Sequence, residues 1–330
     1  MAGSLRDSGL AVAGGADRLA ARVAAAVHAP AEAVGAAAES AGNFVADLIE
    51  AGARRLGKPG FALHWLSTVV SAAFQFVVMI WRAVLNIVAN FLAGLIRMAV
   101  GGLAGLVARD ARVFVRGASD IVAGIAGAGV AIFATFLALV QSLLFMQLGE
   151  RPLTSDERAL LDKVYRGSVA LDNVRIIDGS AGAFNLLRKF TLGNRIYMKG
   201  DFSKGDWAKQ CPDVFVHECC HVWQNQHEGT RYVIDALWAQ WRYQIAKKNA
   251  YDWRAELAAG KTRWEDFNKE AQAEFLRDVY RYGRLGAGAG GVRGEFFDDP
   301  AAPGACFAEL TDFAQKSVSF VRAAGKRAPA

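Results

Sequence analysis

Two long stretches without charge dominate the first half of the chain. Phe61–Trp81 carries no formal charge, and Ile121–Gly149 has no charged residue at all. Further apolar segments follow Arg82 and Arg97 between these stretches. A helix needs about 20 mainly apolar residues to cross a bilayer. The pattern therefore predicts that residues 59–150 form a hydrophobic, mostly α-helical region that inserts into a membrane.

A soluble alternative stays open for this region. Four amide side chains interrupt the apolar stretches: Gln75, Asn86, Asn90 and Gln141. A helical hairpin buried inside an α-helical domain could accommodate them through hydrogen bonds. Arginine is unfavourable in the middle of a bilayer. We therefore expect Arg82 and Arg97 to mark the ends of spans or to lie in the membrane interface.

Residues 1–58 form a different segment, which is rich in alanine. Leu19, Val23 and Val27 recur four residues apart, which is the spacing of one helix face. The segment lacks a charged leader followed by a compact apolar stretch and a cleavage site, so it does not have the pattern of a secretory signal. The prediction is an Ala-rich helix ahead of the hydrophobic region.

The second half of the chain shows the patterns of helices mixed with short strands. Thr154 and Glu157 have the spacing of a capping box at the start of a helical stretch. Asn173–Ile177 is rich in β-branched residues, and Arg195–Met198 predicts a second short strand. A later helix carries large apolar side chains that are expected to lie in the core: Trp238, Trp241, Tyr243 and Ile245.

The C-terminal segment, residues 285–330, begins with a glycine-rich stretch, 285–291. This composition predicts a lid or a linker. A final amphipathic helix is expected at about Cys306–Val321, ahead of a basic tail.

The run His217-Glu218-Cys219-Cys220-His221 carries the clearest chemical signal. On a helix, residues four apart lie on one face, so two imidazoles can hold one zinc ion. The glutamate between them lies beside the metal, where it can take a proton from zinc-bound water. Three of the five histidines fall between residues 217 and 227, which favours a metal site over unrelated surface histidines.

Two candidates exist for the third protein ligand. His227 has the position that the longer motif H-E-x-x-H-x-x-G-x-x-H requires, but Gln224 replaces the glycine that lets the chain turn back. The helix is instead expected to continue towards Gly229, which moves His227 off the zinc face. Glu270 and Glu274 share a face of a later helical stretch, where they could complete a zinc shell or form a solvated acidic face.

The sequence from Glu270 to Glu274 resembles the E-x-x-A-[DE] helix that supplies the third ligand in many zincin metallopeptidases. A closer resemblance, over residues 151–282, is to bacterial zinc-peptidase domains called Vgr-related, which are associated with type VI secretion loci. Six segments carry it: Leu153–Glu157, Val174–Ile176, Thr191–Tyr197, Phe215–Glu218, His221–Gln226 and the helix of Glu270.

The resemblance implies His217, His221 and Glu270 as zinc ligands. It implies Glu218 as the general base and Glu274 as the carboxylate that orients an imidazole. Zinc is accordingly the expected cofactor.

The resemblance also implies the fold, an α+β zincin-like catalytic domain at residues 151–284. In zincins an edge strand ahead of the motif helix often aligns the substrate, and Arg195–Met198 is the candidate here. Tyr251 and Tyr280 are candidate donors to the oxyanion. The adjacent pair Cys219–Cys220 departs from the pattern, because apolar or small residues are more usual there, and it raises the question of oxidation or thiol ligation.

Charge and cysteine content narrow the classes of partner. The net charge of +6 is spread along the chain without a concentrated basic patch, so no nucleic-acid partner is expected. Four cysteines, two of them adjacent, do not form a disulfide framework.

The leading hypothesis is a membrane-associated zinc metallopeptidase that acts on a protein or peptide. The resemblance implies a secreted or injected bacterial effector, whose partners would be membrane lipid, a secretion apparatus, a chaperone or an immunity protein. Two alternatives stay open. One is a non-catalytic binding or structural module of a secretion system, and the other is a membrane-active toxin whose activity lies in residues 61–149.

Overall fold

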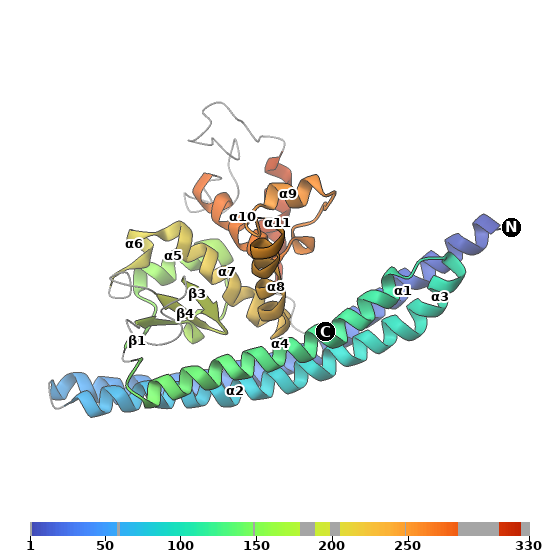
Figure 1. Cartoon of the computed structure of the whole chain (residues 1–330). Helices are drawn as coiled ribbons and strands as arrows, with labels where there is room; N and C mark the ends of the chain where they lie inside the picture. The colour runs from blue at the N-terminus through green and yellow to red at the C-terminus, as the bar shows by residue number, and fades with distance from the viewer. Residues whose placement is uncertain are drawn as a thin grey trace.

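The chain folds into two parts, a layer of long helices and a globular part that rests on one side of this layer (Figure 1). The structure is a computed structural model. It describes the residues 2–57, 60–147, 149–178, 189–198, 205–247, 249–282 and 310–324.

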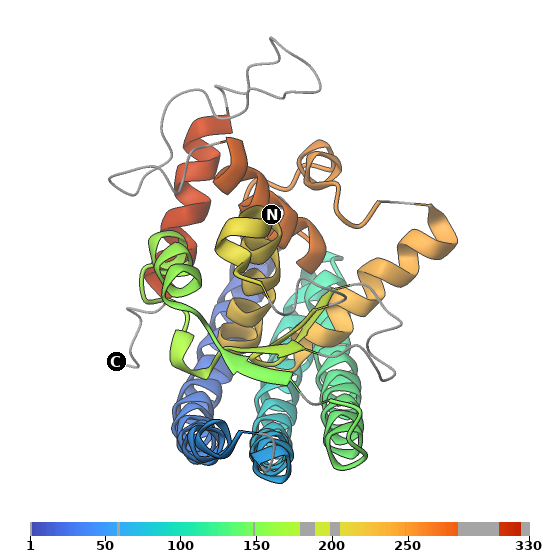
Figure 2. The ribbon, with the colours of Figure 1, turned by 90° about the vertical axis from the view of Figure 1, so that its left-hand side faces the viewer.

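Long helical stretches that run side by side form the layer. Helix α1 covers Ala2–Leu56, and α4 covers Arg112–Leu143. Between them, α2 (Phe61–Ile96) continues through a π-helical turn, η2 (Arg97–Gly101), into α3 (Gly102–Ala108). Helix α2 packs on α1 along one side and on α4 along the other (Figure 2). The layer is therefore one helix thick and is not a closed bundle.

Two of these helical stretches are long and apolar enough to cross a membrane. These stretches are Phe61–Ala108 and Arg112–Leu143, judged by their length and composition alone. Both are only partly buried against the rest of the chain. The expected apolar helices are therefore present.

Buried ion pairs join α2 to α1. Arg82 donates hydrogen bonds to Glu32 at 2.7 and 2.8 Å and to Glu39 at 3.0 Å. Arg97 donates to Asp17 at 2.7 Å. The two arginines are only 3% and 7% exposed. The structure therefore places them inside the layer instead of at the ends of membrane spans, because α1 presents carboxylates opposite each one.

Polar contacts also attach the globular part to the layer. Asp120 of α4 is fully buried and accepts hydrogen bonds from Arg97 and from Arg231 of α8 (Arg231–Ala246). Arg195 donates to Ser71 of α2 at 2.9 Å. Further contacts of this kind are Arg175–Asp47, Asn194–Glu39 and Asn173 to the carbonyl of Ala36.

A four-stranded sheet with the order β1-β2-β4-β3 lies next to the layer. Its strands are β1 (Gly149–Pro152), β2 (Arg175–Asp178), β3 (Phe190–Leu192) and β4 (Arg195–Met198). The central pair β2–β4 is parallel, whereas β1 and β3 run antiparallel to their neighbours. Both predicted strands are confirmed, the first with a shift of two residues at its start.

The strand that was expected to align a substrate is not an edge strand. β4 pairs with β2 on one side and with β3 on the other, so its backbone groups are already used. Within the described residues, β3 is the edge strand nearest the motif helix. The two-residue turn at Gly193–Asn194, where Gly193 has a φ of 62°, makes a hairpin of β3 and β4. This turn chemistry is the signal that sequence reasoning missed.

Helices surround the sheet and enclose the main core of the globular part. They are α5 (Ser155–Tyr165), η3 (Leu171–Asn173), α6 (Trp207–Gln210), α7 (Pro212–Glu228), α8, α9 (Trp253–Ala258), η6 (Trp264–Asp266), α10 (Lys269–Tyr282) and α11 (Thr311–Ala324). The predicted capping box of Thr154 and Glu157 opens α5. Large buried side chains such as Trp207, Phe215 and Phe275 fill the space around α7 and α10. The described chain is thus mostly helical with one small sheet.

Three large apolar side chains of α8 do not lie in the core. Trp238, Trp241 and Ile245 are between half and two-thirds exposed, because α8 turns Tyr232 and Ala239 inward instead. The expectation for these three residues was wrong. Three other expectations concern the side chain of Tyr243, the stretch 285–291 and Cys306, all of which lie outside the part of the chain that the structure describes.

Candidate metal centre

Helix α7 carries the H-E-x-x-H run. Pro212 occupies the first turn, where its missing N–H has no partner to lose, and Gly229 ends the helix with a φ of 68°. His217 and His221 lie one turn apart, with ring centroids separated by 5.1 Å. Both side chains are buried beneath the surface of the globular part. The predicted helix and its continuation to Gly229 are confirmed.

Glu270, in the first turn of α10, brings a carboxylate to the two imidazoles. Its Oε2 lies 3.6 Å from Nε2 of His217 and 3.5 Å from Nε2 of His221. Ligand atoms of all three residues lie within 4.8 Å of one another. Ligands about 2.1 Å from one zinc ion at tetrahedral angles would be roughly 3.4 Å apart. The three side chains therefore lie close enough together to hold one metal ion.

Each of the three side chains has a second partner that holds its orientation. Nδ1 of His217 lies 3.1 Å from Oε2 of Glu274, and Nδ1 of His221 lies 2.8 Å from Oε1 of Gln224. Both histidines therefore turn Nε2 towards the shared space. Gln240 of α8 donates to Oε1 of Glu270 at 2.7 Å. Such outer contacts orient metal ligands and fix the tautomer of histidine.

Sequence reasoning included Glu274 in this arrangement but missed the two glutamines. Gln224 follows His221 by three residues on α7, a spacing at which side chains on a helix meet. That spacing could have indicated its role. Gln240 reaches the site only because α8 packs beside α10, so no local pattern could indicate it.

Glu218 lies beside the imidazoles, almost fully buried. Thr191 of the edge strand β3 donates to Oε2 of Glu218 at 2.9 Å, and it also approaches the backbone carbonyl of Glu218 at 3.1 Å. The carboxylate of Glu218 is therefore held between α7 and β3. Sequence reasoning identified Glu218 but not Thr191.

Electrostatic contacts within the cluster shift its pKa values strongly. Burial lowers the pKa of His217, but hydrogen bonds to Glu270 and Glu274 outweigh it and raise the value to about 10. Burial raises the pKa of Glu270, yet the two nearby imidazoles hold it well below its usual range. Despite burial, contact with His217 also lowers the pKa of Glu274, so Glu270 and Glu274 are both ionised beside the imidazoles.

His227, the alternative ligand, lies outside this cluster. Its Nε2 is 2.7 Å from the carbonyl oxygen of Ser168, and its ring packs 4.7 Å from that of Trp223. The helical continuation of α7 places it there, as the missing glycine predicted.

The two tyrosines and the cysteine pair have separate surroundings. The ring of Tyr251 lies 6.0 Å from that of His217, whereas Tyr280 packs against the main core. Cys219 and Cys220 are free thiols that are completely buried, and burial raises the pKa of both. Buried neutral thiols are poor nucleophiles and poor metal ligands.

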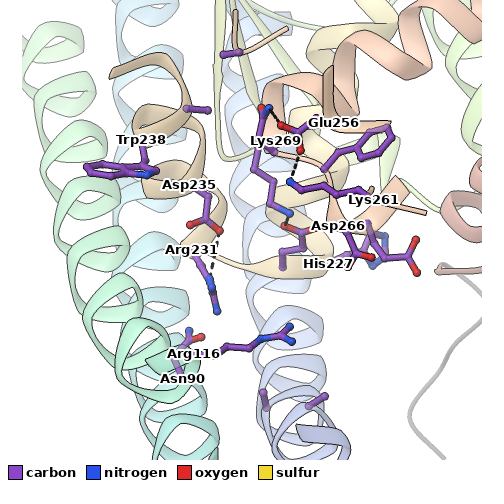
Figure 3. Close-up of a pocket in the computed structure, with 18 of the residues that line it drawn as sticks. Asn90, Arg116, His227, Arg231, Asp235, Trp238, Glu256, Lys261, Asp266 and Lys269 are labelled. Atoms are coloured by element: carbon purple, nitrogen blue, oxygen red, sulfur yellow. Dashed lines mark hydrogen bonds and ion pairs between the residues drawn. The ribbon is translucent and has the colours of Figure 1, made fainter. Parts of the chain in front are cut away.

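A separate cavity of about 1140 Å³ lies between the helical layer and the globular part (Figure 3). Arg116 of α4 and the α8 residues Arg231, Asp235 and Trp238 line it, together with His227. The metal-centre residues are not among those that line it. The charges around it are of both signs, and Arg231 pairs with Asp235 at 3.3 Å.

Part of the chain is similar to a type VI secretion protein. The relative is the type VI secretion system spike protein VgrG2b of Pseudomonas aeruginosa, which is 27% identical over 135 residues. The match covers 39% of this chain and 13% of that protein, so the chain spans only a small part of its length. No protein-family model and no solved structure matches the chain. The similarity suggests an association with type VI secretion.

Proposed function

We propose that the chain is a membrane-associated zinc metallopeptidase. The observation that carries the proposal is the convergence of His217, His221 and Glu270, with Glu218 near enough for its charge to act on both histidines. Two imidazoles and one carboxylate are the protein ligands of catalytic zinc sites, which keep one position for water or substrate. Structural zinc sites usually have four protein ligands. The donor set therefore favours hydrolysis.

When bound, zinc would polarise a peptide carbonyl and lower the pKa of water. Glu218 would accept a proton from the attacking water and pass it to the leaving amine. Thr191 would hold the Glu218 carboxylate in the direction needed for both transfers. Tyr251, which lies near His217, is the better placed of the two candidate tyrosines to approach the carbonyl oxygen.

The substrate would pass beside β3, because Thr191 in the middle of this strand contacts Glu218, the general base. Backbone groups at this strand are in use, since the hydroxyl of Tyr232 accepts from the N–H of Gly193 at 3.0 Å and donates to the carbonyl oxygen of Thr191 at 3.4 Å. The substrate class that this arrangement favours is a segment of a protein or a peptide.

The similarity to a type VI secretion spike protein supports a role as a bacterial effector that is secreted or injected into a target cell. Its partners would be the secretion apparatus and, as for other toxic enzymes, a chaperone or an immunity protein. The two long apolar helices support association with a membrane. They also favour a second candidate function, a membrane-active toxin that acts through residues 61–149.

Elemental mass spectrometry of the full-length protein tests the metal site directly. We expect about one zinc per chain, the stoichiometry of a single-ion site. Glu270→Ala should lose the metal, whereas Glu265→Ala, a change outside the cluster, should keep it. Absence of zinc under metal-replete conditions would contradict the peptidase and favour a non-catalytic binding module.

A liposome-leakage assay tests the second candidate function. Leakage that the full-length protein causes and that persists in Glu218→Gln would favour the membrane-active toxin.

A further inference from the structure

Helix α2 has one continuous apolar side that the described residues of the chain do not cover. From Leu66 onwards, at about 100° per residue, its exposed large side chains fall within one arc roughly 120° wide. They are Leu66, Phe74, Val77, Ile80, Trp81, Val84, Val88, Phe91, Leu92 and Leu95. With a rise of 1.5 Å per residue, this arc extends for about 44 Å. No charged residue of α2 lies in it.

The opposite side of α2 is polar and faces the rest of the chain. It carries buried hydrogen-bonding groups: Ser67, Thr68, Ser71, Gln75, Arg82 and Asn86. Ser71 contacts Arg195 of the sheet, and Arg82 contacts α1. Helix α2 is therefore amphipathic along most of its length, with its polar side held inside the molecule.

Helix α4 has the same division. Its buried side contains small and polar residues, including Asp120, Gly127 and Thr135. Gly127 allows the start of α8 to approach closely, because a Cβ there would lie 2.7 Å from the carbonyl oxygen of Thr230. Its exposed side carries Phe114, Val115, Val122, Ile125, Phe133, Phe136 and Leu143. Because the buried sides of α2 and α4 contact the globular part at Ser71 and Gly127, their apolar sides face away from it.

Crossing a bilayer would destroy these contacts. A span requires a helix that is apolar all round, whereas a helix with one polar side suits the plane of the interface. Insertion of α2 would separate Arg82 from both of its carboxylate partners on α1. Insertion of α4 would remove Asp120 from Arg231. The folded structure is therefore compatible with a membrane only if both helices lie along it.

Charges at the two ends of the layer indicate the kind of surface that it fits. Arg54 lies near the turn between α1 and α2, and Arg112 lies at the opposite end. Their side chains are 70% and 86% exposed, whereas the carboxylates that pair with them are 19% and 20% exposed. Both ends therefore present cations to an outside partner. An apolar face with basic ends complements the acyl chains and headgroups of an anionic leaflet.

We propose that the apolar side of the α2–α4 layer docks in the plane of one leaflet of an anionic bilayer. The globular part then stays in water above it. This inference rests on the membrane association in the proposed function, and it specifies that the helices lie in the plane of the membrane. It does not depend on the zinc chemistry.

Flotation of the full-length protein with vesicles tests the proposal. We expect it to float with phosphatidylcholine vesicles that contain about one-third phosphatidylserine, and less with phosphatidylcholine alone. The double variant Val77→Glu/Val122→Glu should reduce the bound fraction at least tenfold. The matched variant Trp241→Glu/Ile245→Glu changes equally exposed apolar residues on α8 and should bind as the parent does. Equal loss in both variants, or no loss in either, would overturn the docking surface.

Labelling of introduced cysteines separates docking from spanning. Leu56→Cys and Ala111→Cys place thiols at opposite ends of the α2–α3 stretch. On vesicles, a membrane-impermeant maleimide should label both from outside. Protection of one end alone would show a span and overturn the proposal.

Sedimentation tests whether a second copy of the chain covers the apolar side instead. The proposal would be overturned if the parent does not float with vesicles but forms a dimer that dissociates in Val77→Glu/Val122→Glu. Zinc content of the same samples reports on the peptidase separately.

Discussion

At the scale of single residues, the proposed chemistry depends most on Glu218. Glu218→Gln should retain zinc, because the ligands are unchanged, but peptide hydrolysis should fall at least about a hundredfold. The matched control is Glu228→Gln on the same helix, where the side chain pairs with Lys269 at 2.5 Å and contacts none of the proposed ligands. Zinc analysis and turnover of a cleaved peptide measure both effects. Full activity in Glu218→Gln would reject the role as general base.

Thr191 is a positioning residue in this scheme. Thr191→Val keeps the shape of the side chain but removes the hydrogen bond to Glu218. A hydrogen bond to a charged group contributes about 1.5–3 kcal/mol, so kcat should fall roughly tenfold or more. KM and zinc content should change little, and Thr191→Ser should restore most of kcat. A rise in KM with unchanged kcat would instead indicate a role in substrate binding alone.

At the scale of elements, the packing of α1 on α2 depends on a buried arginine. Arg82→Met would leave the buried Glu39 and the partly buried Glu32 without their cation, which typically costs about 3–5 kcal/mol in the free energy of unfolding. Urea unfolding followed by circular dichroism measures the change. Arg263→Met, which breaks an exposed pair with Asp266, should cost no more than about 1 kcal/mol.

A triple variant tests the cause of this loss. Arg82→Met combined with Glu32→Gln and Glu39→Gln removes the unpaired charges and should recover part of the stability. If the triple variant is less stable than Arg82→Met, burial of unpaired carboxylates is not the reason for the loss.

At the scale of the whole molecule, the contact between the layer and the globular part should depend on pH. His28 of α1 lies between the two parts, where burial and the nearby His227 lower its pKa to about 4. In the unfolded chain the value is about 6.5. Above about pH 6.5 His28 is neutral in both the folded and the unfolded chain, so it causes no loss of stability there. As the pH falls from about 6.5 to about 4, only the unfolded chain gains the proton, and stability is lost.

The expected contribution of His28 is about 2.5 kcal/mol of destabilisation between about pH 7.5 and pH 4.5. Urea unfolding of the parent and of His28→Gln at both values measures it, because other titrating groups cancel in the comparison. The variant should lose less stability on acidification than the parent does. An identical pH dependence in both proteins would exclude His28 as the titrating group.

The larger architecture was only partly predictable. Local patterns correctly indicated the long helices, the capping box at Thr154 and the second strand at Arg195–Met198. They could not show which strand lies at the sheet edge, because strand order depends on pairing between distant segments. They also placed Trp238 and Trp241 in the core, whereas the packing of α8 leaves both exposed.

The sequence by itself determined the features that depend only on spacing along one helix. It placed His217, Glu218 and His221 together on α7, since residues four apart share a face whatever surrounds them. Tertiary structure alone decided that Glu270 meets both imidazoles, because this depends on how α10 packs against α7. It also decided that Arg82 is neutralised by α1, and so that the apolar helices turn a polar side inward. Hydropathy counts apolar residues along a chain, but only packing shows on which side of the helix they lie.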